Sequence, residues 1–593
     1  MDTPMKDHIV MTPKSKTSNS TTLAIERQSI PIESKPSDKM HVAGGDHRGI
    51  VINKEIVSKG DDVPAQLSLE FRVFLVNAQT GMHTQESRIL QFWFIADLGE
   101  REQATVAQEF FRELVSPQEF PRDYVGFIKK VMKLLQHKYA SILKVEVTLK
   151  QLEQGQVPPA RPLSADESSL GVAPLLTAEK LLELIESAYP NPVLEEELAR
   201  EHGWEQEAVA ALLVELQTKG LVRAVEHGAF TRAGQADSQL QVVKQMPTMV
   251  SAKQPTIAII TAQYCEKLAV DTMIENKETF VRYTTVGPGA TRQLAGGARG
   301  LRRFGESNVY TLGNMGAHRI VCTKLPTVGH TREAMTAAGN TTTRLLGTFQ
   351  KVDFVFLVGV GGGVPHYTDY SKHVRLGDVV ISYPVEGKKY TYVYCESAKS
   401  SPHGGFEFET KEYCPPNSGL QEIAAKLHMQ ATCNGGVTPW VTYMEDGVNQ
   451  LKQTDAEHDF SQPSADTDKL YMAIGEHDLI EVAHPAPSEG MAKRLSGRPR
   501  LHLAPVASGR TIAREDQLRQ HFSAHTGALA FDSEFDAVIE SVLGNCRESF
   551  MCVRGVADYK DGTRRREWQP YASLAAAAVM KSIICCMDPP TDA

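Results

Sequence analysis

The hydrophobic and polar positions near the start of the chain change period several times, and these changes predict a small α+β domain over residues 64–150. Three aromatic, β-branched or alternating runs are typical of strands, and two runs with apolar residues at helical spacing are typical of helices. The predicted strands are Leu69–Val76, Ile89–Ala96 and Ile142–Leu149, and the predicted helices are Glu100–Val115 and Tyr124–His137.

Residues 172–235 have the pattern of a winged-helix-like domain. Helical spacing runs over Thr177–Tyr189, Val193–His202 and Glu205–Lys219, and two short apolar runs, LVRAV and GAFTRA, then predict a hairpin. Between Thr177 and Ala233 there are 5 Lys and Arg against 11 Glu. Such a surface repels phosphates, so we expect a protein partner here ahead of DNA, which stays as an alternative.

Three further segments lack apolar periodicity. Residues 1–63 are rich in Ser, Thr, Lys, Pro and Gly, which predicts a disordered tail. Residues 151–171 and 236–254 have the composition of linkers.

The stretch Asp353–Pro365, DFVFLVGVGGGVP, is central to the remaining domain, residues 255–587. Its apolar run predicts a strand buried on both faces. Gly361, Gly362 and Gly363 predict a turn whose backbone N–H groups can approach a ligand, although a glycine turn without a ligand fits equally well. The spacing does not fit GxGxxG, which argues against a dinucleotide site.

Further short apolar strands alternate with helical segments in this domain, which predicts an α/β fold with a central mixed sheet. A strand at Thr256–Thr261 runs directly into a helix that carries Glu266 in its first turn. The other segments are the strands LGDVVIS, LAPVASG, GALAFDSEF and FMCVRGVADYKDG and the helices Arg332–Phe349 and Tyr571–Ile584.

Composition adds limits. The net charge of −9 gives no general attraction to nucleic acid or anionic lipid, and no apolar run is long enough to span a bilayer. The first residues lack the apolar core of a signal peptide. The 9 cysteines form no CxxC pair, which fits a reducing compartment and gives no metal site. Cytosol is the expected location.

Several motifs of residues 255–587 stand in the order found in the purine nucleoside phosphorylase and 5′-methylthioadenosine/S-adenosylhomocysteine nucleosidase superfamily, which the segment resembles. These motifs are TAQYCE, VGVGGGVP, RLGDVVIS, ASG, FDSE and RGVADYKDG, followed by WQPYA. The resemblance is greatest to the eukaryotic multidomain branch, which is similar to immune-type nucleosidases, some of which cleave ATP.

The resemblance implies the roles of the acids. Asp558 corresponds to the acid that protonates the leaving purine, and Glu266 to the acid that activates water. Glu534, beside Asp532 and Ser533, corresponds to the carboxylate that binds the ribose hydroxyls. Further substrate contacts are expected from the glycines 361–363 and from Gly509, Arg510 and Ile512.

Hydrolysis and phosphorolysis both stay open. Phosphorylases of the bacterial purine type carry an arginine where this chain has Glu266, and a glutamate there repels phosphate and suits a base for water. Val360 stands where the family often has a hydroxyl residue. The expected co-substrate is therefore water, or phosphate if the protein is a phosphorylase, with no other cofactor.

The substrate is a purine nucleoside or nucleotide, and the loop after ASG lacks the aromatic residue that often stacks on adenine. Cations between the motifs permit a 5′-phosphate chain, hence ATP, although solvated surface is their alternative. They are Arg292, Arg299, Arg302, Arg303, His318, Arg319, His330, Arg332, Lys372, His373, Arg375 and Arg510. A polar insertion, residues 383–500, is a candidate cap. The family implies a homo-oligomer, and we expect the N-terminal modules to gate the enzyme. A non-catalytic nucleotide-sensing module is a further alternative.

Overall fold

The structure is a computed structural model. It describes residues 5–31, 40–44, 48–56, 63–76, 83–116, 120–121, 123–152, 175–225, 228–233, 240–250, 253–285, 304–326, 332–401, 405–432, 438–455, 457–474, 479–487, 493–495, 497–533, 535–560 and 565–590.

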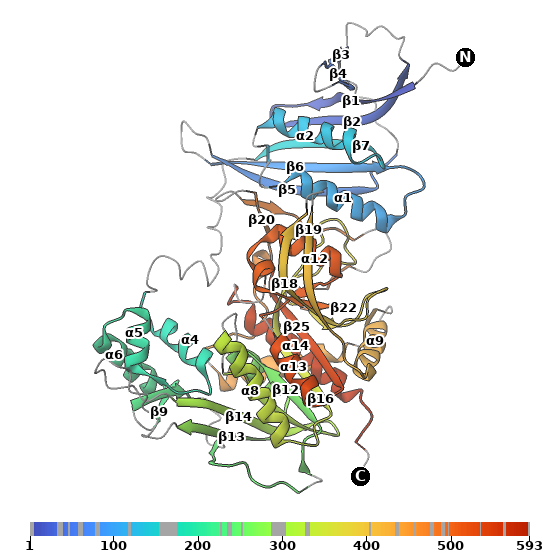
Figure 1. Cartoon of the computed structure of the whole chain (residues 1–593). Coiled ribbons are helices and arrows are strands. Elements are labelled where there is room, and N and C mark those ends of the chain that lie inside the picture. Colours follow the sequence, from blue (N-terminus) through green and yellow to red (C-terminus); the bar gives the residue numbers. More distant parts are fainter. Residues whose placement is uncertain are drawn as a thin grey trace. The chain divides into compact units, whose positions relative to one another are not determined.

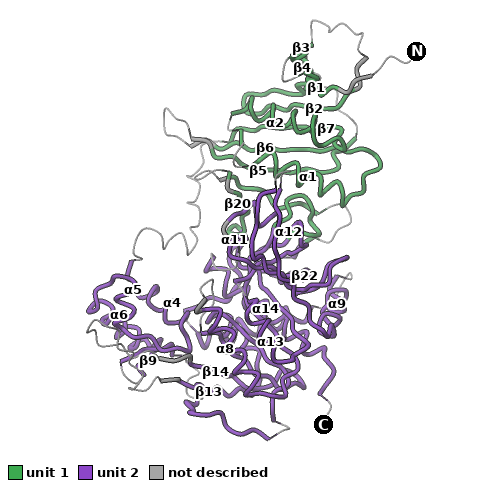
Figure 2. Tube along the Cα trace, viewed as in Figure 1, with its two compact units in different colours: residues 1–162, 365–373, 466–493 green, residues 163–364, 374–465, 494–593 purple. Residues whose placement is uncertain are grey.

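The chain forms two compact units that do not follow the order of the sequence (Figure 2). The first contains Met1–Pro162, Pro365–His373 and Asp466–Lys493. The second contains Leu163–Val364, Val374–Ala465 and Arg494–Ala593. The predicted catalytic segment 255–587 therefore contributes two pieces to the first unit.

The first unit is built on a mixed sheet in the order β20-β21-β5-β6-β7-β2-β1-β4-β3 (Figure 1). Its strands are β1 Met5–Lys16, β2 Ser20–Pro31, β3 Met40–Val42, β4 Ile50–Asn53, β5 Leu67–Val76, β6 His83–Phe94, β7 Ile142–Leu152, β20 Leu470–Ala473 and β21 Leu479–Val482. Helices α1 (Glu100–Leu114) and α2 (Tyr124–His137) bury Phe111 and Phe127 against Phe71 of β5. The α+β elements expected for residues 64–150 are all present.

The prediction of a disordered tail for residues 1–63 is wrong over its described part. β1 pairs antiparallel with β2, and β2 pairs antiparallel with β7. Leu23 and Ile25 are buried. The polar composition concealed two alternating segments whose apolar residues gain burial by joining an existing sheet.

The winged helix is present in the second unit. It has helices α4 (Ala178–Ala188), α5 (Glu195–His202) and α6 (Gln206–Thr218). Its small sheet has the order β8-β10-β9, with β8 Val193–Leu194, β9 Val222–Val225 and β10 Ala229–Arg232. Leu181, Ile185 and Leu213 lie in a hydrophobic core of its own.

The rest of the second unit surrounds a large mixed sheet. Its strands are β11 Leu240–Val242, β12 Ile257–Thr261, β13 Glu275–Thr285, β14 Phe304–Met315, β15 His318–Lys324, β16 Phe354–Gly363, β17 Val379–Ser382, β18 Tyr392–Ser400, β19 Phe406–Tyr413, β22 Leu501–Ala504, β23 Val506–Ser508, β24 Ala530–Phe531 and β25 Ser549–Asp558. β12, β16 and β25 run parallel at its centre, whereas the pairs β14–β15, β16–β24 and β17–β25 are antiparallel. The expected α/β fold with a mixed sheet is confirmed.

Helices cover this sheet. They are α7 Tyr264–Met273, α8 Arg332–Thr348, α9 Gly419–Thr432, α10 Pro439–Thr454, α11 Arg510–Arg514, α12 Asp516–Thr526, α13 Asp536–Gly544 and α14 Gln569–Cys585. α14 is apolar around nearly its whole circumference and is buried, which is typical of a core helix.

Two expected connections have more structure than their composition indicated. β11, within the predicted linker 236–254, pairs parallel with β13, and Met246 and Met249 pack against the core. The predicted insertion 383–500 is divided between the units: β18, β19, α9 and α10 belong to the second, and β20 and β21 to the first.

Candidate active site

The candidate acids lie on segments that meet at the carboxyl end of β16. Gly362 pairs with Asp558 of β25 on one side and with Phe531 of β24 on the other. The N–H of Val360, two residues earlier, donates to Oε1 of Glu266 at 2.8 Å. Adjacent strands lie about 4.8 Å apart, so these three segments share one end of the sheet.

The prediction of a glycine turn at residues 361–363 is wrong, because β16 continues to Gly363. Close neighbours on both sides explain the glycines. A Cβ on Gly359 would lie 2.4 Å from Oε1 of Glu266, and one on Gly361 would lie 2.9 Å from the carbonyl oxygen of Phe531. Glycine usually weakens a strand, but here it allows these close approaches.

Glu266 occupies the third position of α7 and is 2% exposed. Its Oε2 accepts from the N–H groups of Ala262 at 2.7 Å and Gln263 at 2.8 Å, and its Oε1 from that of Val360. Burial raises the pKa of Glu266 above its ordinary value, while the backbone donors and the charge of Arg554 oppose the rise. A carboxylate has roughly four lone-pair positions, so one on Oε1 remains for a water molecule.

Asp558 is the last residue of β25 and is 2% exposed. Its Oδ1 accepts from the N–H of Lys560 at 2.7 Å. Arg519 of α12 donates to the carbonyl oxygen of Tyr559 at 3.2 Å and to Asp516 Oδ1 at 2.7 Å. Arg519 therefore holds the turn after the strand, and the N–H of Lys560 orients the Asp558 carboxyl group.

Asp532 follows β24 directly, and its carboxylate is engaged inside the protein. Its Oδ2 lies 2.9 Å from Nη2 of Arg554, and both side chains are 1% exposed. The hydroxyl of Tyr392 lies 2.8 Å from Asp532 Oδ1 and accepts from the N–H of Phe535 at 3.0 Å. These contacts fix Asp532 and the backbone of Phe535.

The other predicted substrate residues have mixed outcomes. Glu534 lies outside the described residues, and Ser533 beside it is partly exposed. Gly509 precedes α11, where Arg510 is exposed. Ile512 is fully buried in a hydrophobic cluster that includes Phe531.

Sequence reasoning missed Arg554, Tyr392 and Ser508 as members of this centre. The guanidinium group of Arg554 is fully buried and lies 4.2 Å from the centre of the Phe535 ring. Ser508 Oγ lies 2.8 Å from the Tyr392 hydroxyl. A signal for Arg554 did exist, since it is the one charge within the apolar run FMCVRGVA.

The cations proposed for a phosphate chain are distributed over several parts of the chain. Lys372 and His373 belong to the first unit, and His318 is buried with Nε2 3.5 Å from the carbonyl oxygen of Met587. The side chains of Arg292, Arg299, Arg302, Arg303, His330 and Arg332 lie outside the described part of the chain.

Two searches of the described residues gave negative results. No group of three or more His, Cys, Asp or Glu side chains there could hold a metal ion. No described helix is both long and apolar enough to cross a bilayer.

The geometry defines a class of protein: an α/β domain with buried acids at the carboxyl end of its central strands, joined to a winged helix. Residues 167–234 match the family model described as a winged helix-turn-helix domain, which confirms the predicted winged helix.

A curated protein and several solved structures are also similar to parts of the chain. A nucleotide-binding leucine-rich repeat (NLR)-like protein of Hyaloscypha variabilis is 27% identical over 287 residues, covering 48% of this chain and 26% of that protein. The chain thus spans about a quarter of the length of this curated relative.

Solved nucleosidases match part of the chain, at low sequence identity and with low TM-scores. A 5′-methylthioadenosine/S-adenosylhomocysteine nucleosidase of Colwellia psychrerythraea, in complex with adenine, is 14% identical, covers 57% of this chain and 98% of its own, and has a TM-score of 0.29. Futalosine hydrolase of Helicobacter pylori is 13% identical, covers 56% and 99%, and also has a TM-score of 0.29. Such scores leave the activity to be argued from the site itself.

Proposed function

We propose that residues 255–587 hydrolyse the N-glycosidic bond of a purine nucleoside or nucleotide. The observation that carries the proposal is the meeting of Glu266, Asp558 and the segment after β24 at one end of β16. Two of these acids are 2% exposed, as expected of groups that act on a substrate away from bulk water.

Cleavage of the N-glycosidic bond creates opposite charges on its two sides, and the site must stabilise each of them. Negative charge develops on the departing purine, and Asp558 donates a proton to it. Positive charge develops on the ribose, which the carboxylate of Glu534 binds and stabilises. Glu266 accepts a proton from the attacking water.

The contacts of Glu266 favour water over phosphate as the attacking group. Three N–H groups at the start of α7 and in β16 could otherwise bind an anion, but each donates to the Glu266 carboxylate. A phosphate would have to displace this internal anion or approach it against charge repulsion.

The finer parts of the proposal rest on the motif resemblance. The substrate is a nucleotide such as ATP, cleaved to adenine and ribose triphosphate. The protein is a cytoplasmic homo-oligomer, and its N-terminal modules bind a protein partner that gates the site. The NLR-like relative is consistent with an immune-type role.

The direct test is to incubate the purified full chain with ATP, adenosine, methylthioadenosine and inosine, with and without phosphate, and to measure free base. Phosphate-independent release of base without ribose 1-phosphate is expected. Asp558→Asn should reduce release by about 100-fold or more, whereas Asp446→Asn, an exposed acid on α10, should not. Binding without base release would show a nucleotide sensor, and phosphate-dependent release would show a phosphorylase.

A further inference from the structure

The winged helix and the start of α7 share a buried aromatic contact. Tyr264 is the first residue of α7, two positions before Glu266, and is 8% exposed. The ring of Tyr189, at the end of α4, meets the Tyr264 ring edge-on with 5.4 Å between centroids. The guanidinium group of Arg232, the last residue of β10, lies 5.1 Å from the centre of the Tyr264 ring. Guanidinium groups stack favourably on aromatic faces.

Hydrogen bonds within the winged helix fix the side chain of Arg232. Its Nε donates to Glu186 Oε1 at 2.7 Å, and its Nη1 donates to the carbonyl oxygens of Leu221 at 2.7 Å and Ala233 at 2.6 Å. The side chain is 3% exposed. Because the guanidinium group is planar and held at three points, its face toward Tyr264 has one orientation.

A second contact fixes the end of α4 against the sheet. Lys324, the last residue of β15, is fully buried, and its Nζ donates to the carbonyl oxygens of Ser187 at 3.0 Å, Tyr189 at 2.8 Å and Leu325 at 3.0 Å. All three N–H donors of the ammonium group are used. β15 is the parallel neighbour of β12, the strand that leads into α7.

We infer that the winged helix is a positioning element for Glu266, and that Arg232 and Tyr189 act through the Tyr264 ring to fix the first turn of α7. This inference rests on the proposed function. Glu266 can activate water only when its free lone pair faces the ribose, and small displacements of a catalytic group are costly in rate. The winged-helix fold serves here as an internal support, and its excess of Glu over Lys and Arg disfavours DNA as a ligand.

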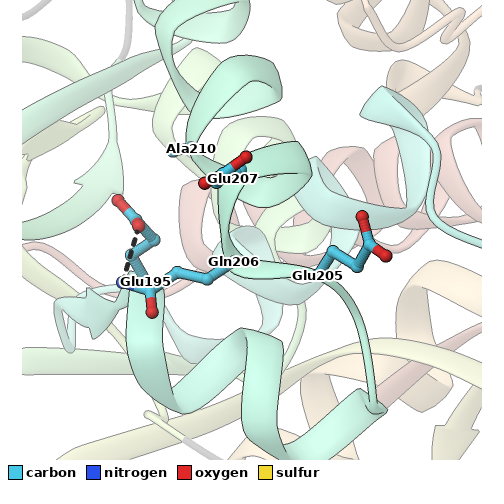
Figure 3. Close-up of a pocket in the computed structure, with 5 residues that line it drawn as sticks. All are labelled: Glu195, Glu205, Gln206, Glu207 and Ala210. Carbon is cyan, nitrogen blue, oxygen red and sulfur yellow. Dashed lines mark hydrogen bonds between the residues drawn. The ribbon is translucent and has the colours of Figure 1, made fainter.

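A pocket of the winged helix provides a control. The residues that line it are Glu195 of α5, Glu205 at the N-cap of α6, and Gln206, Glu207 and Ala210 of α6 (Figure 3). Glu207 is exposed and has no part in the Tyr264 contact. Glu207→Gln therefore changes the same domain without changing the support of α7.

The test uses three variants of the full chain: Tyr264→Leu, Arg232→Met and the double variant. The two single variants are considered first. Each should lower kcat by about 10-fold or more and leave KM within about two-fold, because water activation suffers and base binding does not. Tyr264→Phe, which keeps the aromatic face, should restore most of kcat. The double variant should be no slower than the slower single variant, since both changes break one contact.

Arg232→Met is chosen because Glu186, the acidic partner of Arg232, is still paired with a second cation, His458, after the substitution. Burial alone would lower the pKa of His458, but the carboxylates of Asp455 and Glu186 raise it to about 9. At neutral pH His458 therefore stays charged, with Nε2 3.3 Å from Glu186 and Nδ1 3.3 Å from Asp455.

Amide hydrogen exchange separates failure of this inference from failure of the proposed function. If the wild-type chain releases no base, the support is still tested by faster exchange at Ala262, Gln263 and Val360 in Tyr264→Leu and Arg232→Met, with β25 unchanged. Unchanged exchange there, unchanged kcat, or independent additive effects of the two substitutions would overturn the inference. Glu207→Gln should match wild type in every measurement.

Discussion

At the scale of single residues, the candidate centre combines two kinds of buried carboxylate. Oδ2 of Asp532 lies 2.9 Å from Nη2 of Arg554, which neutralises the carboxylate, so Asp532 has a structural role. Glu266 has only backbone N–H partners within hydrogen-bond distance among the contacts above, and these leave an acceptor position open. A carboxylate bound by peptide donors is fixed in place while its charge is only partly compensated, which suits a base that must accept a proton.

This arrangement predicts the acid side of the pH profile. Glu266 works as a base only when ionised, and burial raises its pKa. Activity should therefore be full above the pKa of Glu266 in the folded protein and be lost as the pH falls through it. We expect the midpoint of this loss in kcat/KM to lie above about 4.3, the ordinary value for glutamic acid.

The measurement is base release against pH, with circular dichroism at each pH to show that the chain stays folded. Glu266→Gln has no carboxyl group to titrate, so its residual activity should lack this limb. A midpoint at or below the ordinary value would contradict the assignment of Glu266 as the base.

At the scale of elements, β16 shows both what the sequence predicts and what it does not. The apolar run from Phe354 predicts a buried strand because it is short and β-branched, and that strand is present. Its end could not be predicted, since glycine has low strand propensity and only pairing with β24 and β25 extends the strand to Gly363. The motif resemblance indicated Glu266 and Asp558, but the buried partners Arg554 and Tyr392 depend on tertiary packing.

Gly359→Ala tests the close approach of β16 and α7. The added Cβ would lie 2.4 Å from Glu266 Oε1, so the carboxylate must move. We expect a loss of about 1–3 kcal/mol in unfolding free energy and a fall of about 10-fold or more in base release, measured by chemical denaturation and by the release assay.

Gly347→Ala in α8 is the matched control, because a Cβ there meets nothing within 4 Å. Alanine suits a helix better than glycine, so this variant should gain up to about 1 kcal/mol and keep full activity. Equal behaviour of the two variants would show that the approach of Glu266 to β16 is unimportant.

At the scale of the whole molecule, sequence-distant segments join in ways that local patterns do not reveal. Val482 of β21 pairs with Phe71 of β5, so a piece of the predicted insertion completes a sheet of the N-terminal unit. Periodicity predicts a strand but carries no information on so remote a partner. The same limit explains the error at residues 1–63, where composition indicated disorder while Ile25 is fully buried between Met11 and Val145 on neighbouring strands.

The last prediction concerns this N-terminal sheet. Ile25→Ala removes a side chain buried at the centre of β2, and substitutions of this kind cost about 2–5 kcal/mol. Amide exchange in β1, β2 and β7 should therefore become faster, while β16 and β25 of the second unit keep their protection. Lys16→Ala, an exposed position of β1, should leave exchange unchanged. Rapid exchange of residues 5–31 in the wild-type chain, unaffected by Ile25→Ala, would instead support a disordered tail. The two outcomes differ at the same peptides, so one exchange experiment decides whether the first residues complete the sheet.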